Sequence, residues 1–458
     1  MTKKYIPAPY EAARARSVSL LRMGWIILVL SLATHFVFFS HPPETVFDEV
    51  HFGKFVSGYF TGEYYFDIHP PLGKLLIAGV AKITDFKPGF SFETIGQKFS
   101  DDSYKWLRFL PKLAGTLLPI VIFLIAFQIG ISQKFAFLAG ILIVFENSLL
   151  VQSRFILLDS FLLLFGFLGI LFFLKAKAYR LSPKFLFLSG FFAALAASIK
   201  WTGLGFLALM GLFYFINLLK SPVVEPRRLG SLRGTAEKKL KLALKGLVFL
   251  IVIPFMIYFL IFAVHFTFLD KPGPGSAFHP PNFQEDNILK KFVELNTELY
   301  ASNARLTATH PYSSEWYEWP LMIRSVFYWQ GDNERIYLLG NPLIYWLSTI
   351  AVIYFLINTF KKLKSLSSSH SLLVLSYLLN LLPFIFIGRV MFLYHYFISL
   401  IFAVLILCFQ LDKLKNKKVF NAVLIGSIVL FLFFSPLTYG FEIPDWYHKM
   451  TVWLPSWR

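Results

Sequence analysis

Long apolar segments recur along most of the chain, and their lengths are those of membrane-spanning helices. A bilayer core about 30 Å thick needs about 20 mostly apolar residues per helix. This pattern predicts an all-α polytopic membrane protein. We expect eleven spans, near residues 22–40, 111–130, 133–151, 156–175, 184–199, 202–219, 244–267, 341–360, 371–388, 392–411 and 418–437.

Two long polar stretches, residues 41–110 and 268–340, separate these spans. Because the number of spans is odd, both stretches fall on the same side of the membrane as the C-terminal tail. We therefore divide the chain into an N-terminal transmembrane catalytic module (1–267), a second external loop (268–340) and a C-terminal transmembrane module with its tail (341–458). The external loops are expected to carry amphipathic helices. The first span has no small-residue cleavage site after it and is predicted to be an uncleaved anchor.

Composition supports the membrane class. The chain is 56% hydrophobic and 15% charged, whereas a soluble domain has roughly 45 to 50% apolar and about 25% charged residues. Its single cysteine, Cys408, lies in an apolar run, so a disulfide or a cysteine-based metal site within one chain is excluded.

Lys and Arg gather on one side of the predicted spans. With the N-terminus inside, cytoplasmic segments hold more than half of the 44 Lys and Arg, whereas all but four of the 26 Asp and Glu face outward. Because cytoplasmic loops carry the excess of Lys and Arg, we expect a cytoplasmic N-terminus and an external C-terminus. The net charge of +18 then reflects anchoring against anionic lipid, and no nucleic-acid role is predicted.

The first external loop opens with two carboxylates and an imidazole at the membrane surface, Asp48, Glu49 and His51. In a short amphipathic helix, Asp48 and His51 are three residues apart and share a face. A carboxylate at this position is suited to act as a base. It is equally suited to cap a helix or to meet solvent, since it closely follows a span.

A second cluster in the same loop contains Asp67, His69 and Lys74. Two consecutive prolines follow His69 and force an extended backbone, so we expect Asp67 and His69 on a stiffened segment before a helix that starts near Leu72. An Asp-x-His pair is also suited to ligate a metal ion, although two ligands alone fall short of a protein site. We predict that no metal or other cofactor is required.

Several ionisable residues lie at the ends of spans, where they are costly and mark either a function or a buried partner. Glu146 and Asp159 flank Arg154 at the turn between two spans, which fits a structural ion pair as well as a site. Arg154 offers a fork of donors suited to grip a phosphate. Lys200 and Arg389 fall at the same outer level, where a cation either binds phosphate or reaches toward lipid headgroups.

The second external loop adds a dense run of aromatic residues that begins with His310 and Tyr312. Such a run is typical of an interfacial belt, and it equally suits a platform for a sugar or a peptide.

One reaction uses all of these groups together, the transfer of a sugar from a polyprenyl phosphate. A carboxylate base removes the proton of an acceptor hydroxyl, cations at the membrane surface hold the phosphate, and a pocket between spans takes the lipid. Because the leaving phosphate has a second pKa of about 6, it departs largely without a proton donor.

Six motifs resemble those of the protein O-mannosyltransferases, a family of the GT-C class of glycosyltransferases. Together they are specific, because they keep one order from about residue 45 to 400. The motifs are Phe-Asp-Glu-Val-His-Phe-Gly (47–53), Asp-Ile-His-Pro-Pro-Leu-Gly-Lys (67–74), Ser-Arg-Phe-Ile-Leu-Leu-Asp (153–159), Ile-Lys-Trp-Thr-Gly-Leu (199–204), His-Pro-Tyr-Ser-Ser-Glu-Trp-Tyr-Glu-Trp-Pro-Leu (310–321) and Arg-Val-Met-Phe-Leu-Tyr-His-Tyr (389–396).

The resemblance implies a GT-C fold and an inverting transfer of mannose from a polyprenyl-phosphate mannose to Ser or Thr of a translocated protein. It implies that Asp48 is the catalytic carboxylate, that its neighbour Glu49 shapes the acceptor site, and that Arg154 contacts the phosphate. We also expect donor-binding roles for Lys200, Arg389 and His395, and substrate-positioning roles for His51, Asp67, His69, Lys74, Asp159, His310 and Tyr312.

The chain departs from the family pattern in one loop. Eukaryotic members carry a β-trefoil insertion before span eight, and residues 268–340 are too few for a domain of roughly 150 residues. The chain therefore resembles a compact bacterial form, located in the inner (plasma) membrane, or in the endoplasmic reticulum membrane if it is eukaryotic. The implied partners are the polyprenyl-phosphate-linked sugar donor, a translocated acceptor protein, membrane lipids and the secretion machinery.

Two alternatives stay open at this point. A related GT-C enzyme passes a sugar from the same donor class to a lipid or glycan, as in aminoarabinose transfer to lipid A. The motifs at 310–321 and 389–396 favour the protein acceptor. A secondary transporter would place its charges along a midplane path between repeated halves, whereas here the charges cluster at one face and no repeat is found.

Overall fold

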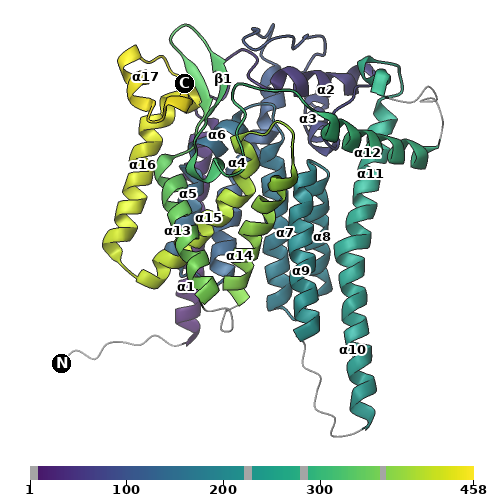
Figure 1. Cartoon of the computed structure of the whole chain (residues 1–458), viewed down its shortest axis with the longest axis vertical. Coiled ribbons are helices and arrows are strands. Elements are labelled where there is room, and N and C mark those ends of the chain that lie inside the picture. Colours follow the sequence, from purple (N-terminus) through teal and green to yellow (C-terminus); the bar gives the residue numbers. More distant parts are fainter. Residues whose placement is uncertain (1–8, 221–228, 279–286, 362–367) are drawn as a thin grey trace.

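The computed structural model describes residues 9–220, 229–278, 287–361 and 368–458. Within them, long helices form a bundle, and shorter helices and a two-stranded hairpin gather at one end of it (Figure 1). The bundle helices are α1 (Pro9–Phe36), α4 (Tyr104–Gln128), α5 (Gln133–Val144), α6 (Asn147–Arg154), α7 (Asp159–Ala178), α8 (Pro183–Ala197), α9 (Leu204–Lys220), α10 (Leu229–Leu247), α11 (Ile253–Phe268), α13 (Pro342–Lys361), α14 (Ser368–Leu381), α15 (Phe397–Leu414) and α16 (Lys417–Tyr439).

Nine helices within the described ranges are long and apolar enough to cross a membrane. One of them, Glu237–Phe268, joins α10 and α11 through a π-helical turn at Val248–Val252. Each of the eleven predicted segments is mostly helical. The predicted fold class, an all-α polytopic membrane protein, is confirmed, and the hairpin is a small addition that the apolar pattern did not indicate.

The predicted spans at 133–151 and 184–199 differ from regular spanning helices. The first is broken, because α5 and α6 meet at 53°. At the break, Glu146 has an extended backbone and its carboxylate caps α6 by accepting the Leu149 N–H at 2.7 Å. The second, α8, is apolar but has only 15 residues, a length of about 22 Å at 1.5 Å per residue.

Helix α15 forms the centre of the bundle and packs against α5, α13 and α14. In its most apolar stretch 72% of the residues are buried, compared with 11% in the Ser17–Phe36 part of α1 and 17% in Glu237–Phe268. The last two segments therefore lie at the periphery, and Figure 1 shows α10 and α11 standing beside the bundle. Their exposed leucine, isoleucine and phenylalanine side chains suit contact with lipid.

The parts of the two long loops and the C-terminal tail that form regular structure lie at the same end of the bundle (Figure 1). This agrees with the prediction that all three share one side of the membrane. The elements are α2 (Glu49–Thr61), α3 (Leu72–Lys82), α12 (Ile288–Arg305), the antiparallel strands β1 (Val326–Gln330) and β2 (Arg335–Leu338), and α17 (Asp445–Thr451).

Helix α2 is held closely against the loop that follows α3. A Cβ atom on Gly53 would lie 2.2 Å from the ring of Phe92, so only glycine allows this ring to seat on the helix. Phe92 is fully buried there. The helix ends at Gly62, whose φ of +79° is left-handed and whose N–H bonds to the Gly58 carbonyl. These contacts fix the helix that begins beside Asp48.

Candidate functional site

A cavity of about 1160 Å³ lies where the loop elements meet the ends of the bundle helices. Its wall combines the start of α2, the start of α7, the junction of α8 with α9, the end of α12 and the segment between α14 and α15. Most of the site residues predicted from the sequence line it, namely Asp48, His51, Asp67, His69, Asp159, Lys200, Arg389 and His395.

Apolar side chains continue this cavity between α7, α9 and α14, and they include Leu162, Leu204, Ala208 and Leu379. Phe386, on the cavity wall beyond α14, is 88% exposed. The cavity therefore has a polar part at the outer end and an apolar part that runs along the spans. This combination fits a ligand with a polar head and a long apolar tail.

Asp48 directly precedes α2, and its carboxylate faces the cavity. The residue is half-buried by surface area, and its carboxylate has no hydrogen-bond or ion-pair partner among the described residues. Burial raises the pKa of Asp48 to about 7, Lys200 opposes this shift, and Asp159 and Asp67 add to it. A carboxyl group with this pKa can gain or lose a proton near neutral pH, as a general base must.

Lys200 lies at the junction of α8 with α9, directly opposite the start of α7. Its ammonium group donates to both oxygens of Asp159, at 2.9 and 2.8 Å, and lies 5.2 Å from the ring centre of Tyr394. Asp159 thus both lines the cavity and forms an ion pair, and its partner is Lys200 rather than Arg154, its neighbour in the sequence. The pair keeps a cation in the cavity wall at the polar end.

Arg389 is the second cation of the cavity and lies in the segment between α14 and α15. It is half-buried and has no hydrogen-bond or ion-pair partner within the described part of the chain. Burial lowers the pKa of Arg389, yet an arginine remains protonated at any physiological pH. Its fork of donors is therefore available to a ligand anion.

His395 follows Arg389 and is stacked between aromatic rings. Its ring lies 5.8 Å from Trp319 and 4.7 Å from Tyr394, nearly parallel to both. Its Nδ1 atom lies 3.1 Å from the backbone nitrogen of Phe392. Because Nδ1 is engaged, Nε2 is the ring nitrogen that a ligand in the cavity can contact.

The segment around Asp67 and His69 has no regular secondary structure and bends at Ile68 and His69, and α3 starts at Leu72 as expected. Asp67 forms an ion pair with Lys74 and accepts the backbone N–H of His69 at 3.2 Å. Lys74 also donates to the carbonyls of His69 and Pro70, each at 3.0 Å. Lys74 itself lies behind the cavity wall and holds this segment in place.

Two histidines complete the polar end. Burial, followed by the charges of Lys200 and Lys74, holds the pKa of His69 well below its ordinary range, so its ring is neutral at neutral pH. His51 sits at the exposed edge, and partial burial together with Lys54 lowers its pKa. Within the described residues, no group of three or more His, Cys, Asp and Glu is arranged to hold a metal ion.

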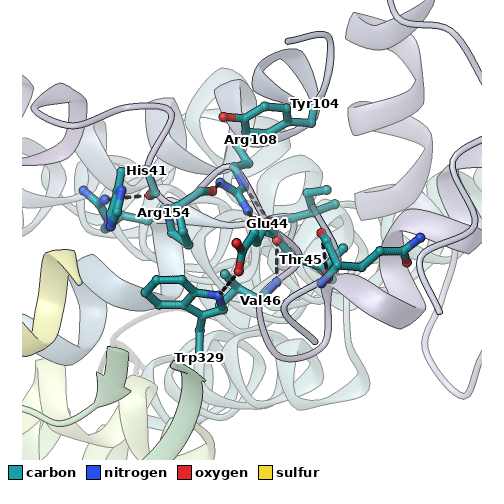
Figure 2. A network of polar contacts seen from close by, with 12 residues as sticks. His41, Glu44, Thr45, Val46, Tyr104, Arg108, Arg154 and Trp329 are labelled. Carbon is teal, nitrogen blue, oxygen red and sulfur yellow. Dashed lines mark hydrogen bonds and ion pairs between the residues drawn. The ribbon is translucent and has the colours of Figure 1, made fainter. Parts of the chain in front are cut away.

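Arg154 lies outside this cavity, contrary to its predicted place at a phosphate. Its guanidinium is fully buried and donates to the carbonyls of Val37, Phe38 and His41, each at 3.2 Å. Figure 2 shows Arg154 directed at His41. Because the bend between α5 and α6 turns the end of α6 toward α1, Arg154 caps the end of α1 instead of facing a ligand.

Glu49 also points away from the cavity, although it follows Asp48. It is fully buried, pairs with Arg108 at 2.6 Å, and accepts the backbone N–H groups of Val46 and Ile156, each at 2.9 Å. Arg108 was not predicted, although it stands just before a span in an apolar context. It also donates to the Glu44 carbonyl, and the two lie together in Figure 2. Glu49 therefore has no contact with the cavity that would support its predicted role in shaping the acceptor site.

The last two predicted residues, His310 and Tyr312, lie one layer behind the cavity wall. The His310 ring stands edge-on to Phe392 at 5.0 Å, and Phe392 lines the cavity. Tyr312 stacks on Phe327 at 5.9 Å. His310 thus supports the wall through Phe392, and Tyr312 contacts His310 at 5.8 Å between ring centres.

Two family models match the chain. One, described as dolichyl-phosphate-mannose-protein mannosyltransferase, matches residues 25–269. The other, described as the C-terminal four TMM region of protein-O-mannosyltransferase, matches residues 288–457.

Individual proteins agree with these models. Protein O-mannosyltransferase 1 of Drosophila melanogaster is 35% identical over 270 residues, which are 57% of this chain and 29% of that protein. Dolichyl-phosphate-mannose–protein mannosyltransferase 1 of Saccharomyces cerevisiae is 33% identical over 282 residues, which are 60% of this chain and 34% of that protein. The chain thus spans about a third of the length of the curated relatives it matches.

The fold has a solved counterpart. A chain of the S. cerevisiae protein O-mannosyltransferase Pmt1-Pmt2 complex bound to the sugar donor has a TM-score of 0.85 and 21% identity, with 95% of this chain and 93% of that chain covered. The first family model covers more than half of the sequence. The chain therefore belongs to the protein O-mannosyltransferase family.

Proposed function

We propose that this protein is a glycosyltransferase that moves mannose from a polyprenyl-phosphate mannose to Ser or Thr hydroxyls of secreted or membrane proteins, with inversion at the sugar. The observation that carries the proposal is the unpaired carboxylate of Asp48, which shares one cavity with the cations Lys200 and Arg389. Family membership agrees with this activity.

The donor phosphate binds, in this proposal, at the polar end between Lys200 and Arg389. Its polyprenyl tail follows the apolar part of the cavity between α9 and α14. When the sugar leaves, the phosphate gains a second negative charge, and two cations in a partly desolvated site stabilise that charge. The proposal requires no metal ion, since these residues carry the neutralisation.

Asp48 acts as the general base. It takes the proton of the acceptor hydroxyl while the hydroxyl oxygen attacks the anomeric carbon of mannose. The bond from that carbon to the phosphate oxygen breaks on the opposite side, and its electron pair stays on the phosphate. One displacement inverts the anomeric centre and leaves the proton on Asp48. Asp159 positions Lys200, while Asp67 and Lys74 hold His69 at the cavity wall.

In this proposal the end of the bundle where the loop elements gather in Figure 1 faces outward, and the reaction takes place there. In this proposal the N-terminus is cytoplasmic, the C-terminus is external, and the acceptor is a translocated protein that arrives from the secretion machinery.

The test compares wild type with Asp48→Asn, purified in lipid nanodiscs with radiolabelled polyprenyl-phosphate mannose and a peptide rich in Ser and Thr. We expect label on the peptide for wild type, a loss of about 10²- to 10⁴-fold for Asp48→Asn, and unchanged donor binding in both. Asp332→Asn, at the exposed turn of the hairpin, is the matched control and should keep full activity.

Other outcomes separate the alternatives. Donor binding without peptide labelling would point to a lipid or glycan acceptor. Normal turnover in Asp48→Asn would remove Asp48 as the base, and no donor binding at all would refute the proposed function.

A further inference from the structure

A chain of side-chain hydrogen bonds connects the β-hairpin to Lys200. The Tyr328 hydroxyl on β1 bonds to the side-chain carbonyl of Gln152, whose amide nitrogen donates to Asp159 at 2.6 Å. Asp159 in turn holds the Lys200 ammonium group with both oxygens. Tyr328 is fully buried, and Gln152 and Asp159 are nearly so, which shields the chain from competing water.

The direction of every bond in this chain is fixed by chemistry. A carboxylate only accepts, so the amide nitrogen of Gln152 must face Asp159 and its carbonyl must face Tyr328. Burial holds the pKa of the Tyr328 phenol well above its ordinary range, so the phenol keeps its proton and donates it to that carbonyl. Each group has one usable orientation, and the chain therefore transmits a definite position to Lys200.

Tyr328 also contacts the residue next to Asp48. Its ring stacks on Phe47 at 4.3 Å between ring centres and 8° between planes, and its backbone carbonyl accepts the Phe47 N–H at 3.0 Å. One residue thus touches both the backbone that carries Asp48 and the bonds that hold Lys200.

The hairpin is irregular at Tyr328. Phe327 pairs with Tyr337 and Trp329 pairs with Ile336, so Tyr328 is an extra residue on β1. Such a bulge redirects a side chain and is common beside active sites. Here the Tyr328 side chain reaches Gln152, which lies 176 positions away in the sequence.

We propose that Tyr328 is a positioning residue that sets the place of Lys200 relative to Asp48, acting through Gln152 and Asp159. The inference rests on the proposed function, because it takes Lys200 as a ligand of the donor phosphate. Without the Tyr328 hydroxyl, Gln152 loses its fixed orientation and Asp159 loses a competing donor. The interaction of Asp159 with Lys200 then becomes stronger, so the positive charge of Lys200 is less available to a phosphate.

The experiment is a double-mutant cycle on the affinity for undecaprenyl phosphate, measured with the purified full chain in nanodiscs. Tyr328→Phe removes the hydroxyl and keeps the ring on Phe47, and Gln152→Met keeps the side-chain length without its hydrogen bonds. Each variant is expected to bind the probe about five- to tenfold more weakly, the effect of one buried hydrogen bond. The double variant should be no weaker than either single variant, because both act through one chain.

Tyr345→Phe is the matched control. Tyr345 is also fully buried, its hydroxyl bonds to Ser148 at 3.1 Å, and it does not line the cavity. A general loss of stability would therefore reduce probe binding equally in Tyr345→Phe and Tyr328→Phe, and that result would overturn the inference. Melting temperatures of all variants, recorded without the probe, allow their stabilities to be compared directly.

The remaining outcomes are also decisive. A Tyr328→Phe affinity within twofold of wild type, or additive losses in the double variant, would refute the inference while leaving the proposed function intact. If wild type itself fails to bind undecaprenyl phosphate, the assignment of Lys200 to a donor phosphate fails, and both the proposed function and this inference fall with it.

Discussion

The titration of Asp48 gives a sharp test of the proposed mechanism. Burial raises the pKa of Asp48 to about 7, and the base works only when it is deprotonated. Therefore kcat/KM should rise as the pH increases through about 7, and it should level off above that pH. One pH unit below the pKa about a tenth of the enzyme has a usable base, and two units below about a hundredth. The donor phosphodiester does not titrate in this range.

The rising part of this pH profile, the acidic limb, should move in a known direction when a charge near Asp48 is removed. Lys200 lowers the pKa of Asp48, whereas Asp159 raises it. Lys200→Met removes the opposing cation and leaves Asp159 without its partner, so the limb should shift to higher pH. Lys54→Met is the control, because Lys54 is exposed on α2 and does not contribute to the shift of Asp48.

The assay measures initial rates of peptide labelling at pH 5 to 9 and extracts kcat/KM, which reports the free enzyme. Asp48→Asn should retain only residual activity without this limb. A wild-type profile that is flat below pH 8, or a limb that stays in place in Lys200→Met, would refute the assignment of Asp48 as the base.

Three further predictions concern other parts of the structure. Arg389→Met should weaken polyprenyl-phosphate binding about tenfold or more. Arg154→Met should keep that affinity and lower the melting temperature, because Arg154 only caps α1. Equal losses of affinity in the two variants would contradict this distinction. Glu49→Gln leaves a fully buried arginine without its counter-ion and should cost about 3 to 5 kcal/mol in chemical unfolding, and an unchanged midpoint would argue against a stabilising pair. Gly53→Ala must displace the ring seated on α2, whereas Gly79→Ala has nothing within 4 Å, so only the first should melt earlier.

The spans and the lengths of the loops were predictable, because they follow from local composition. Runs of apolar residues give the helices directly, and the two prolines before Leu72 give the start of α3. Most cavity residues were predictable for a related reason: Asp48, Lys200 and Arg389 stand in short polar stretches beside spans, and the structure brings these ends together.

The residues whose positions were predicted wrongly owe those positions to contacts between distant parts of the chain. Arg154 is close in sequence to two carboxylates, yet the bend at Glu146 turns it toward carbonyls more than a hundred positions away. Glu49 follows Asp48 directly but points away from the cavity, where it pairs with Arg108 on α4. The pairing of Tyr328 with Gln152 requires a bulge in a hairpin that no apolar pattern indicates.

The shortness of α8 bears on the lipid environment. At about 22 Å, this helix is about 8 Å shorter than a typical hydrocarbon core, and Lys200 follows it closely. In a bilayer of typical thickness the ammonium group would therefore stand below the level of the headgroups, where its pairing with Asp159 offsets the cost of a charge. To reach Lys200, a donor phosphate must therefore either descend from the headgroup plane or meet a bilayer that is thinned around α8. Since such mismatch costs fractions of a kcal/mol per Å, we expect the protein to favour thin membranes and to respond to acyl-chain length.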